Sequence, residues 1–143
     1  MLIEAHAATT SSLRHVDFVA RARAREIAEV INAGTQPLQN LSHLKTIKSL
    51  VGEAHDEKEV AKAGIVKGLT AVERLVCANR DPRFCVGSQL SIADLCVVPQ
   101  LYNARRFGAD LALFPRILAI EEHVSKLPCF VAAHPGVQPD AQP

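Results

Sequence analysis

Apolar residues recur along most of this chain at spacings of three and four, which places side chains on one face of an α-helix. The first such stretch runs from about Asp17 to Ala33, and its inward-facing positions are Ala20, Ala24, Ile27, Ala28 and Ile31. No segment alternates apolar and polar residues over five or more positions with β-branched enrichment, so no strand is predicted. The pattern predicts an all-α fold, a helical bundle of five to six helices.

A break is expected after the first helix, because Gly34 and Pro37 interrupt the pattern. Glycine costs about 1 kcal/mol and proline about 3 kcal/mol in a helix interior. A second helix is predicted from about Pro37 to Leu50, and its inward ridge is Leu38, Leu41, Leu44 and Ile47. The outer side of this helix then carries the polar residues Gln39, Asn40, Ser42 and His43.

The third predicted helix runs from Asp56 to about Asn79 and opens with Asp56-x-x-Glu59, which has the form of a capping box. Gly64 and Gly68 lie one turn apart within it, and glycine inside a helix lowers stability. We therefore expect another backbone to approach closely there. The inward-facing positions are Val60, Ala63, Leu69, Val72, Leu75 and Val76.

The fourth predicted helix begins with a capping box formed by Ser91 and Asp94, contains Pro99 and ends at Gly108. Its inward-facing residues are expected to be Leu95, Cys96 and Val98. A fifth helix from Pro115 buries Ile117, Ile120, Val124 and Leu127, and Pro128 to Ala133 adds one more turn. These elements predict a leader at 1–16, one helical domain at 17–134 and a flexible tail at 135–143.

Composition restricts the possible functions of this 143-residue chain. Apolar residues make up 48% and charged residues 22%, which is typical of one folded domain. A net charge of +1, few aromatic residues and no tryptophan argue against a nucleic-acid-binding surface. No apolar run approaches the ~20 residues that span a membrane. The leader is interpreted as a frayed N-terminus, with a weak transit sequence as the alternative.

The four cysteines, Cys77, Cys85, Cys96 and Cys129, form no CxxC pair and no cluster with zinc spacing. We interpret them as reduced core residues of a cytoplasmic protein, and no metal site is predicted.

Three longer blocks carry a family resemblance. They are GTQPLQNLSHL (34–44), FCVGSQLSIADLCVVPQLYNARRF (84–107) and FPRILAIEEHVSKLPCFVAAHP (114–135), followed by QPD (138–140). Together they resemble the C-terminal domain of zeta-class glutathione transferases, the maleylacetoacetate isomerases of tyrosine and phenylalanine breakdown. The resemblance covers about Phe18 to Asp140. The capping box at Ser91 and Asp94 is shared across transferase classes and indicates the fold only, whereas QPLQNL and VPQLYNARRF are more specific to the zeta class.

The resemblance implies glutathione as cofactor and the cis–trans isomerisation of maleylacetoacetate, a diacid, to fumarylacetoacetate. Family members carry a thioredoxin-like catalytic domain ahead of the helical domain, and nothing in residues 1–17 matches it. We therefore expect no catalytic residue in this chain and no activity by this chain alone. The surface that the other domain covers should be exposed or buried by self-association, as in a homodimer. The alternatives are a non-catalytic interaction module and a truncated gene product.

The resemblance also assigns candidate site residues. Gln36, Asn40, Leu41 and Ser42 correspond to glutathione contacts that form when a thioredoxin-like domain is present, and an amide supplies both a donor and an acceptor. Alternatively, Gln36 and Asn40 are turn and cap residues.

Arg106 corresponds to an arginine near the substrate carboxylates, which a guanidinium can hold with two hydrogen bonds. The alternative is a solvated arginine favoured by the dipole at a helix C-terminus. Arg21, Arg23 and Arg25 are interpreted as a solvated face rather than an anion site, and His43 as a surface residue.

Overall fold

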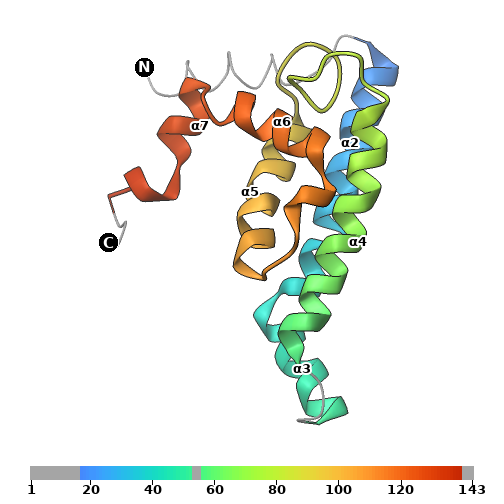
Figure 1. The fold of residues 1–143 in the computed structure, drawn as a ribbon, viewed down its shortest axis with the longest axis vertical. Helices are drawn as coiled ribbons and strands as arrows, with labels where there is room; N and C mark the ends of the chain where they lie inside the picture. Colours follow the sequence, from blue (N-terminus) through green and yellow to red (C-terminus); the bar gives the residue numbers. More distant parts are fainter. Residues whose placement is uncertain (1–16, 53–55, 140–143) are drawn as a thin grey trace.

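The structure is a computed structural model that describes residues 17–52 and 56–139. The predicted leader, 1–16, and the last residues of the predicted tail, 140–143, lie outside this part of the chain. Within it there are helices and no strands, so the all-α prediction is confirmed (Figure 1). The elements are α2 (Phe18–Asn32), η1 (Gln36–Gln39), α3 (Leu41–Val51), α4 (Glu57–Cys77), α5 (Ile92–Arg106), η2 (Leu111–Leu113), α6 (Pro115–Val124), α7 (Pro128–Ala133) and η3 (Pro135–Val137).

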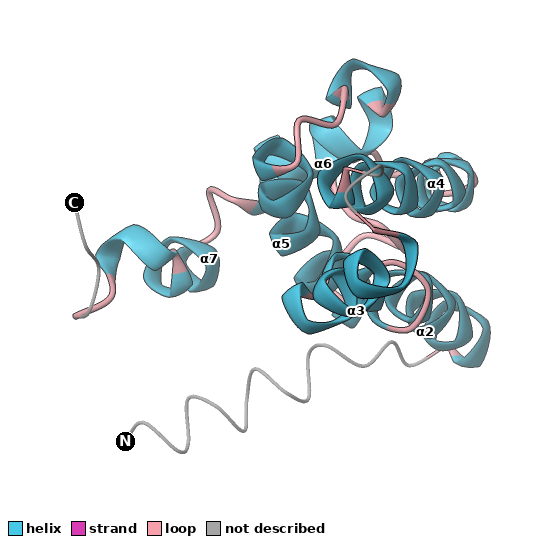
Figure 2. Cartoon of the chain, turned by 90° about the horizontal axis from the view of Figure 1, so that it is seen from below, coloured by secondary structure: helices cyan, strands magenta, loops and turns pink. Residues whose placement is uncertain are grey.

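The long helices α2 and α4 run side by side, and α5 and α6 pack against this pair (Figure 1). Helix α3 extends from one end of the bundle, while α7 and η3 stand away from it near the other end (Figures 1 and 2). The core lies between α2, α4, α5 and α6 and includes the fully buried Ile27, Leu69, Leu101, Ile117 and Ile120.

Asp17 caps α2 and Asp56 caps α4, each by accepting a backbone N–H hydrogen bond in the first turn. The predicted capping box of Asp56 and Glu59 is only half formed, because Asp56 accepts from the Lys58 N–H and Glu59 gives no return bond among the described residues. The predicted capping box of Ser91 and Asp94 is present at the start of α5. The carboxylate of Asp94, which is fully buried, also accepts a 2.8 Å bond from the backbone N–H of Cys85. One side chain thus starts α5 and fixes the preceding loop.

The second helix begins later than predicted. Gln36–Gln39 forms a separate 3₁₀ turn, η1, and α3 starts at Leu41 with Asn40 as its N-cap. Of the predicted apolar ridge, Leu44 is buried and Ile47 half-buried, but Leu38 and Leu41 are exposed. Gln39 is buried, contrary to its expected outward position. The reason is that a 3₁₀ turn has three residues per turn, which rotates side chains away from their α-helical directions.

The predicted inward face of α5 was wrong for Leu95, which is exposed. Cys96 and Val98 are partly buried and pack against the core. The capping box turns Asp94 inward, and the buried apolar side chains around it are Ala93, Val97, Leu101 and Ala104. In α4, Ala63 is exposed, and the buried apolar positions are Ala61, Ile65, Leu69, Val72 and Val76.

All four cysteines are free thiols, but they are not all core residues. Cys85 is buried and Cys96 partly buried, whereas Cys77 and Cys129 are exposed, so the core interpretation was wrong for these two. Burial raises the pKa of the Cys85 thiol, and the nearby Asp94 carboxylate raises it further. Burial also raises the pKa of Cys96.

Candidate functional site

The η1 turn is seated on α4 through the two glycines that the sequence singled out. Thr35, directly before the turn, is fully buried, and its hydroxyl donates a 2.7 Å bond to the carbonyl of Val30. A Cβ added at Gly68 would lie 2.9 Å from the Thr35 Cβ, and one at Gly64 would lie 2.9 Å from Leu38 Cδ1. The predicted close approach exists, but side chains of Thr35 and Leu38 make it, not another backbone.

A second anchor joins η1 to α5. The side chains of Gln39 and Gln100 are both buried and form a reciprocal amide pair. Gln39 Nε2 donates to Gln100 Oε1 at 2.5 Å, and Gln100 Nε2 donates back to Gln39 Oε1 at 3.2 Å. Burial of two amides is tolerated because each satisfies the other. The turn is therefore fixed from the inside at Thr35, Leu38 and Gln39.

The residues that the resemblance assigned to glutathione lie on the outer side of this anchored turn. Gln36, Asn40, Leu41 and Ser42 are all exposed within one short segment. Asn40 also has the cap role that was the alternative, because its Oδ1 accepts from the Ser42 backbone N–H at 3.0 Å and from the Ser42 hydroxyl at 2.7 Å. The cap uses only the amide oxygen, so the Asn40 NH₂ group takes no part in it.

The start of α3 has a positive electrostatic character. Its first turn contains no acidic residue, and the helix carries His43, Lys45 and Lys48 without an Asp or Glu. A helix N-terminus has a partial positive charge from its aligned peptide dipoles and favours anions. The segment thus combines exposed amides with a weakly cationic helix end.

Arg106 lies in the last turn of α5, as the sequence indicated, and is exposed. Within residues 17–52 and 56–139 its guanidinium has no hydrogen-bond or ion-pair partner. Arg106 lies about 9 Å along the axis of α5 from the buried Gln100, at 1.5 Å per residue. Arg105 differs, because its guanidinium holds both carboxylate oxygens of Glu121 at 2.7 and 2.6 Å.

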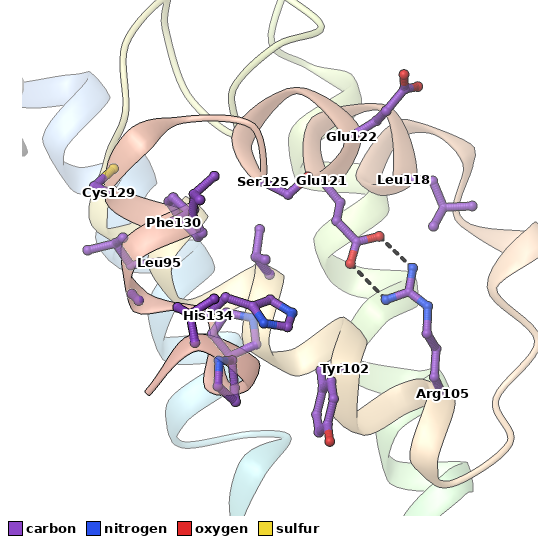
Figure 3. A pocket seen from close by; sticks show the side chains of 16 residues that line it. Leu95, Tyr102, Arg105, Leu118, Glu121, Glu122, Ser125, Cys129, Phe130 and His134 are labelled. Carbon is purple, nitrogen blue, oxygen red and sulfur yellow. Dashed lines mark hydrogen bonds and ion pairs between the residues drawn. The ribbon is translucent and has the colours of Figure 1, made fainter. Parts of the chain in front are cut away.

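An apolar groove, which the sequence did not reveal, lies between α5, α6, α7 and η3 (Figure 3). It has a volume of about 820 Å³. In Figure 3 the Arg105–Glu121 pair lies on one side of it and Cys129 and Phe130 on the other. The signal for it was the apolar set of Leu95, Val98 and Tyr102 on α5, of which Leu95 and Val98 were predicted to face the core.

The described residues contain no group of His, Cys, Asp and Glu that could hold a metal ion. Among the helices described, none is long and apolar enough to cross a membrane.

Comparison with known proteins identifies the family. The profile described as "Glutathione S-transferase, C-terminal domain" matches residues 41–133. The chain belongs to this family, and its all-α fold is that of the helical C-terminal domain.

Its relatives include several maleylacetoacetate isomerases, which confirms the resemblance to the zeta class. A probable maleylacetoacetate isomerase 2 of Drosophila melanogaster is 46% identical over 123 residues, 86% of this chain and 52% of the relative. The maleylacetoacetate isomerase of Mus musculus is 40% identical over 84% of this chain and 53% of its own length. The chain thus spans about half the length of the curated relatives it matches.

Solved structures agree with this assignment. The maleylacetoacetate isomerase of Anaeromyxobacter dehalogenans 2CP-1, crystallised with glutathione in its active site, superposes with a TM-score of 0.84 at 42% identity. That match covers 91% of this chain and 59% of the other. A maleylpyruvate isomerase of Pseudomonas aeruginosa superposes with a TM-score of 0.82 at 36% identity, covering 91% and 69% of the two chains.

Proposed function

We propose that this chain is the helical half of a glutathione-dependent isomerase of the maleylacetoacetate type, with the segment Gln36–Ser42 as the wall that faces glutathione. The observation that carries the proposal is the anchored turn. Its inner residues are fixed on α4 and α5, while Gln36, Asn40, Leu41 and Ser42 remain exposed. A rigid segment with exposed polar groups loses little entropy when a ligand binds.

The donor set of this segment suits glutathione. Glutathione is a zwitterionic tripeptide with two carboxylates and two amide groups, so it needs neutral hydrogen-bonding partners as well as positive charge. Gln36 and the NH₂ group of Asn40, which the helix cap does not use, supply the neutral donors. The α3 N-terminus, without an acidic residue in its first turn, supplies a favourable field for a carboxylate.

Arg106 is proposed to bind a carboxylate of the diacid substrate. Its guanidinium is exposed and unpaired within the described residues, so it is available for a bidentate contact. Glutathione, when bound, supplies the thiol that adds reversibly to the substrate's double bond. This chain contributes binding and orientation of the two molecules, and the group that stabilises the thiolate is expected in the thioredoxin-like half.

We further propose that the 143-residue chain by itself self-associates through the apolar groove. Leu95, Tyr102, Val131 and Val137 are exposed around it, and exposed apolar surface of this kind marks contact sites. Sedimentation should show concentration-dependent dimers that Leu95→Glu disrupts. A monomer at all concentrations, with little binding of a hydrophobic dye, would contradict this.

The protein is also proposed to act in the cytoplasm, where its four unpaired thiols remain reduced.

The ligand site is tested by titrating reduced glutathione into the isotope-labelled chain and following backbone and side-chain amide signals. Shift changes are expected at Gln36, Asn40, Leu41 and Ser42, and not at groove residues such as Leu118. Silence at the segment would favour the non-catalytic interaction module instead.

The reaction is tested by joining the thioredoxin-like half of the Drosophila melanogaster relative ahead of this chain and measuring maleylacetoacetate isomerisation. Arg106→Ala should lower kcat/KM by about ten- to a hundredfold, the range for losing hydrogen bonds to a charged group. Arg25→Ala removes an exposed arginine of α2 and is the matched control, which should leave kcat/KM unchanged. A fusion that folds, binds glutathione and does not isomerise the substrate would contradict the proposed reaction.

A further inference from the structure

The amide pair of Gln39 and Gln100 links the two parts of the proposed site. Gln39 ends the η1 turn, which lies next to the glutathione-facing residues, and Gln100 lies on α5, the helix that carries Arg106. Both amides are buried, at 5% and 3% exposure, so the pair is screened from competing water. Its geometry is reciprocal, which fixes the relative position of the two elements more strictly than one bond would.

The amide pair is separated from both sets of site residues by only a few residues of helical backbone. From Gln39 back to Gln36 a 3₁₀ turn rises about 6 Å at ~2 Å per residue. From Gln100 on to Arg106, α5 rises about 9 Å. Both paths run through hydrogen-bonded helical backbone, and no loop intervenes between the pair and either set of site residues.

We propose that Gln39 and Gln100 are positioning residues that hold the glutathione-facing segment in register with Arg106. The proposal rests on the proposed function, since it concerns the same site. Neither side chain contacts the ligand. Their role is to fix Gln36 and Asn40 on one side and Arg106 on the other at the separation that glutathione and a diacid together require, because small misplacements of binding groups weaken binding strongly.

If the amide pair only packs in the core, its loss should change stability alone. If it positions the site, its loss should also weaken glutathione binding, and single and double substitutions separate these two roles. Gln39→Leu or Gln100→Leu leaves the partner amide buried and unsatisfied, so either one lowers stability. The double variant Gln39→Leu/Gln100→Leu removes both polar groups at once and should restore stability close to the original value. If the pair only fills space, the double variant should also bind glutathione as tightly as the original chain.

The experiment uses the isotope-labelled 143-residue chain with two readouts. The first is the affinity for reduced glutathione from amide shifts of Gln36–Ser42. The second needs no ligand: it is hydrogen exchange at the turn amides of Leu38 and Asn40, which donate to the carbonyls of Thr35 and Pro37. Gln138→Leu makes the same substitution in the C-terminal segment and is the matched control.

We expect the double variant to unfold at the same urea concentration as the original chain. Its affinity for glutathione should fall by about tenfold, as for one or two lost ligand hydrogen bonds, and exchange at Leu38 and Asn40 should quicken. Unchanged affinity and exchange in the double variant would overturn the proposal. If neither the original chain nor the fusion with a thioredoxin-like half responds to glutathione, the proposed function fails, while faster exchange in the double variant still supports the role of the pair in holding the turn.

Discussion

The carboxylate of Glu73, on α4, accepts a 2.8 Å hydrogen bond from the backbone N–H of Arg116, at the start of α6. Its other oxygen accepts from the backbone N–H of Ile117 at 3.0 Å. The residue before α6 is Phe114, which offers no capping side chain, and Pro115 has no N–H. A residue distant in the chain therefore supplies the N-terminal cap of α6 and connects two core helices.

Replacing Glu73 by alanine should lower the free energy of unfolding by about 1–2 kcal/mol, the usual range for losing a cap. Urea unfolding followed by circular dichroism measures this. Glu122→Ala, which removes an exposed carboxylate that pairs with Lys126, is the control and should change stability by less than about 0.5 kcal/mol. Equal effects of the two substitutions would argue against the capping role.

The two glycines of α4 should respond differently to alanine. At Gly68 a Cβ would overlap the buried Thr35 side chain, so Gly68→Ala should destabilise the chain by about 1–3 kcal/mol. At Gly64 a Cβ would lie 2.9 Å from Leu38 Cδ1, the end of a side chain that can rotate, and 3.2 Å from Leu38 Cβ, and the helix propensity of alanine offsets this contact by about 1 kcal/mol. Gly64→Ala should therefore be close to neutral in thermal unfolding. A Gly68→Ala variant as stable as Gly64→Ala would contradict the tight seat of the turn.

The substitution Asn40→Asp tests the capping role of Asn40 separately from its proposed contact with glutathione. Aspartate caps a helix about as well as asparagine, and its charge suits the α3 N-terminus, so the free energy of unfolding should be unchanged or slightly higher. The added negative charge would repel the carboxylates of glutathione and remove the NH₂ donor. Glutathione affinity should then fall about tenfold or more, since one charge-assisted contact is lost. Ligand binding as tight as in the original chain would argue that Asn40 is only a cap.

Thiol alkylation should divide the cysteines into two classes. Cys77 and Cys129 are exposed and, in a solution dilute enough for the chain to be monomeric, should react with iodoacetamide first. The pKa values of Cys85 and Cys96 are raised, so at a given pH a smaller fraction is thiolate and their modification is slower. Mass spectrometry at increasing times measures the order. Cys77→Ser/Cys129→Ser should abolish the fast phase, and a persistent fast phase would place a reactive thiol elsewhere.

The helix boundaries that the sequence predicted well were those with a chemical signal. Asp17, Asp56 and Ser91 with Asp94 are capping residues, and each does start a helix. Gly64 and Gly68 correctly indicated a close contact, because glycine inside a helix needs a packing reason. These signals are local, so one sequence is enough to find them.

The parts that the sequence did not predict depend on tertiary contacts. Gln39 resembles a surface residue until Gln100 is placed opposite it, since a buried amide is acceptable only with its partner. On α5, apolar residues occur on both sides of the helix, so periodicity could not tell the core side, with Val97 and Leu101, from the groove side, with Leu95 and Tyr102. The candidate ligand residues came from family resemblance, because exposed amides and arginines carry no distinctive local pattern.

Neighbouring side chains of the turn have different roles, because the inner ones pack on α4 and α5 and the outer ones are exposed. Thr35, Leu38 and Gln39 hold the backbone in place, so Gln36 and Leu41 can be exchanged without endangering the fold. If the proposed function holds, the glutathione-facing side of this turn can change one residue at a time, with each intermediate still a stable protein.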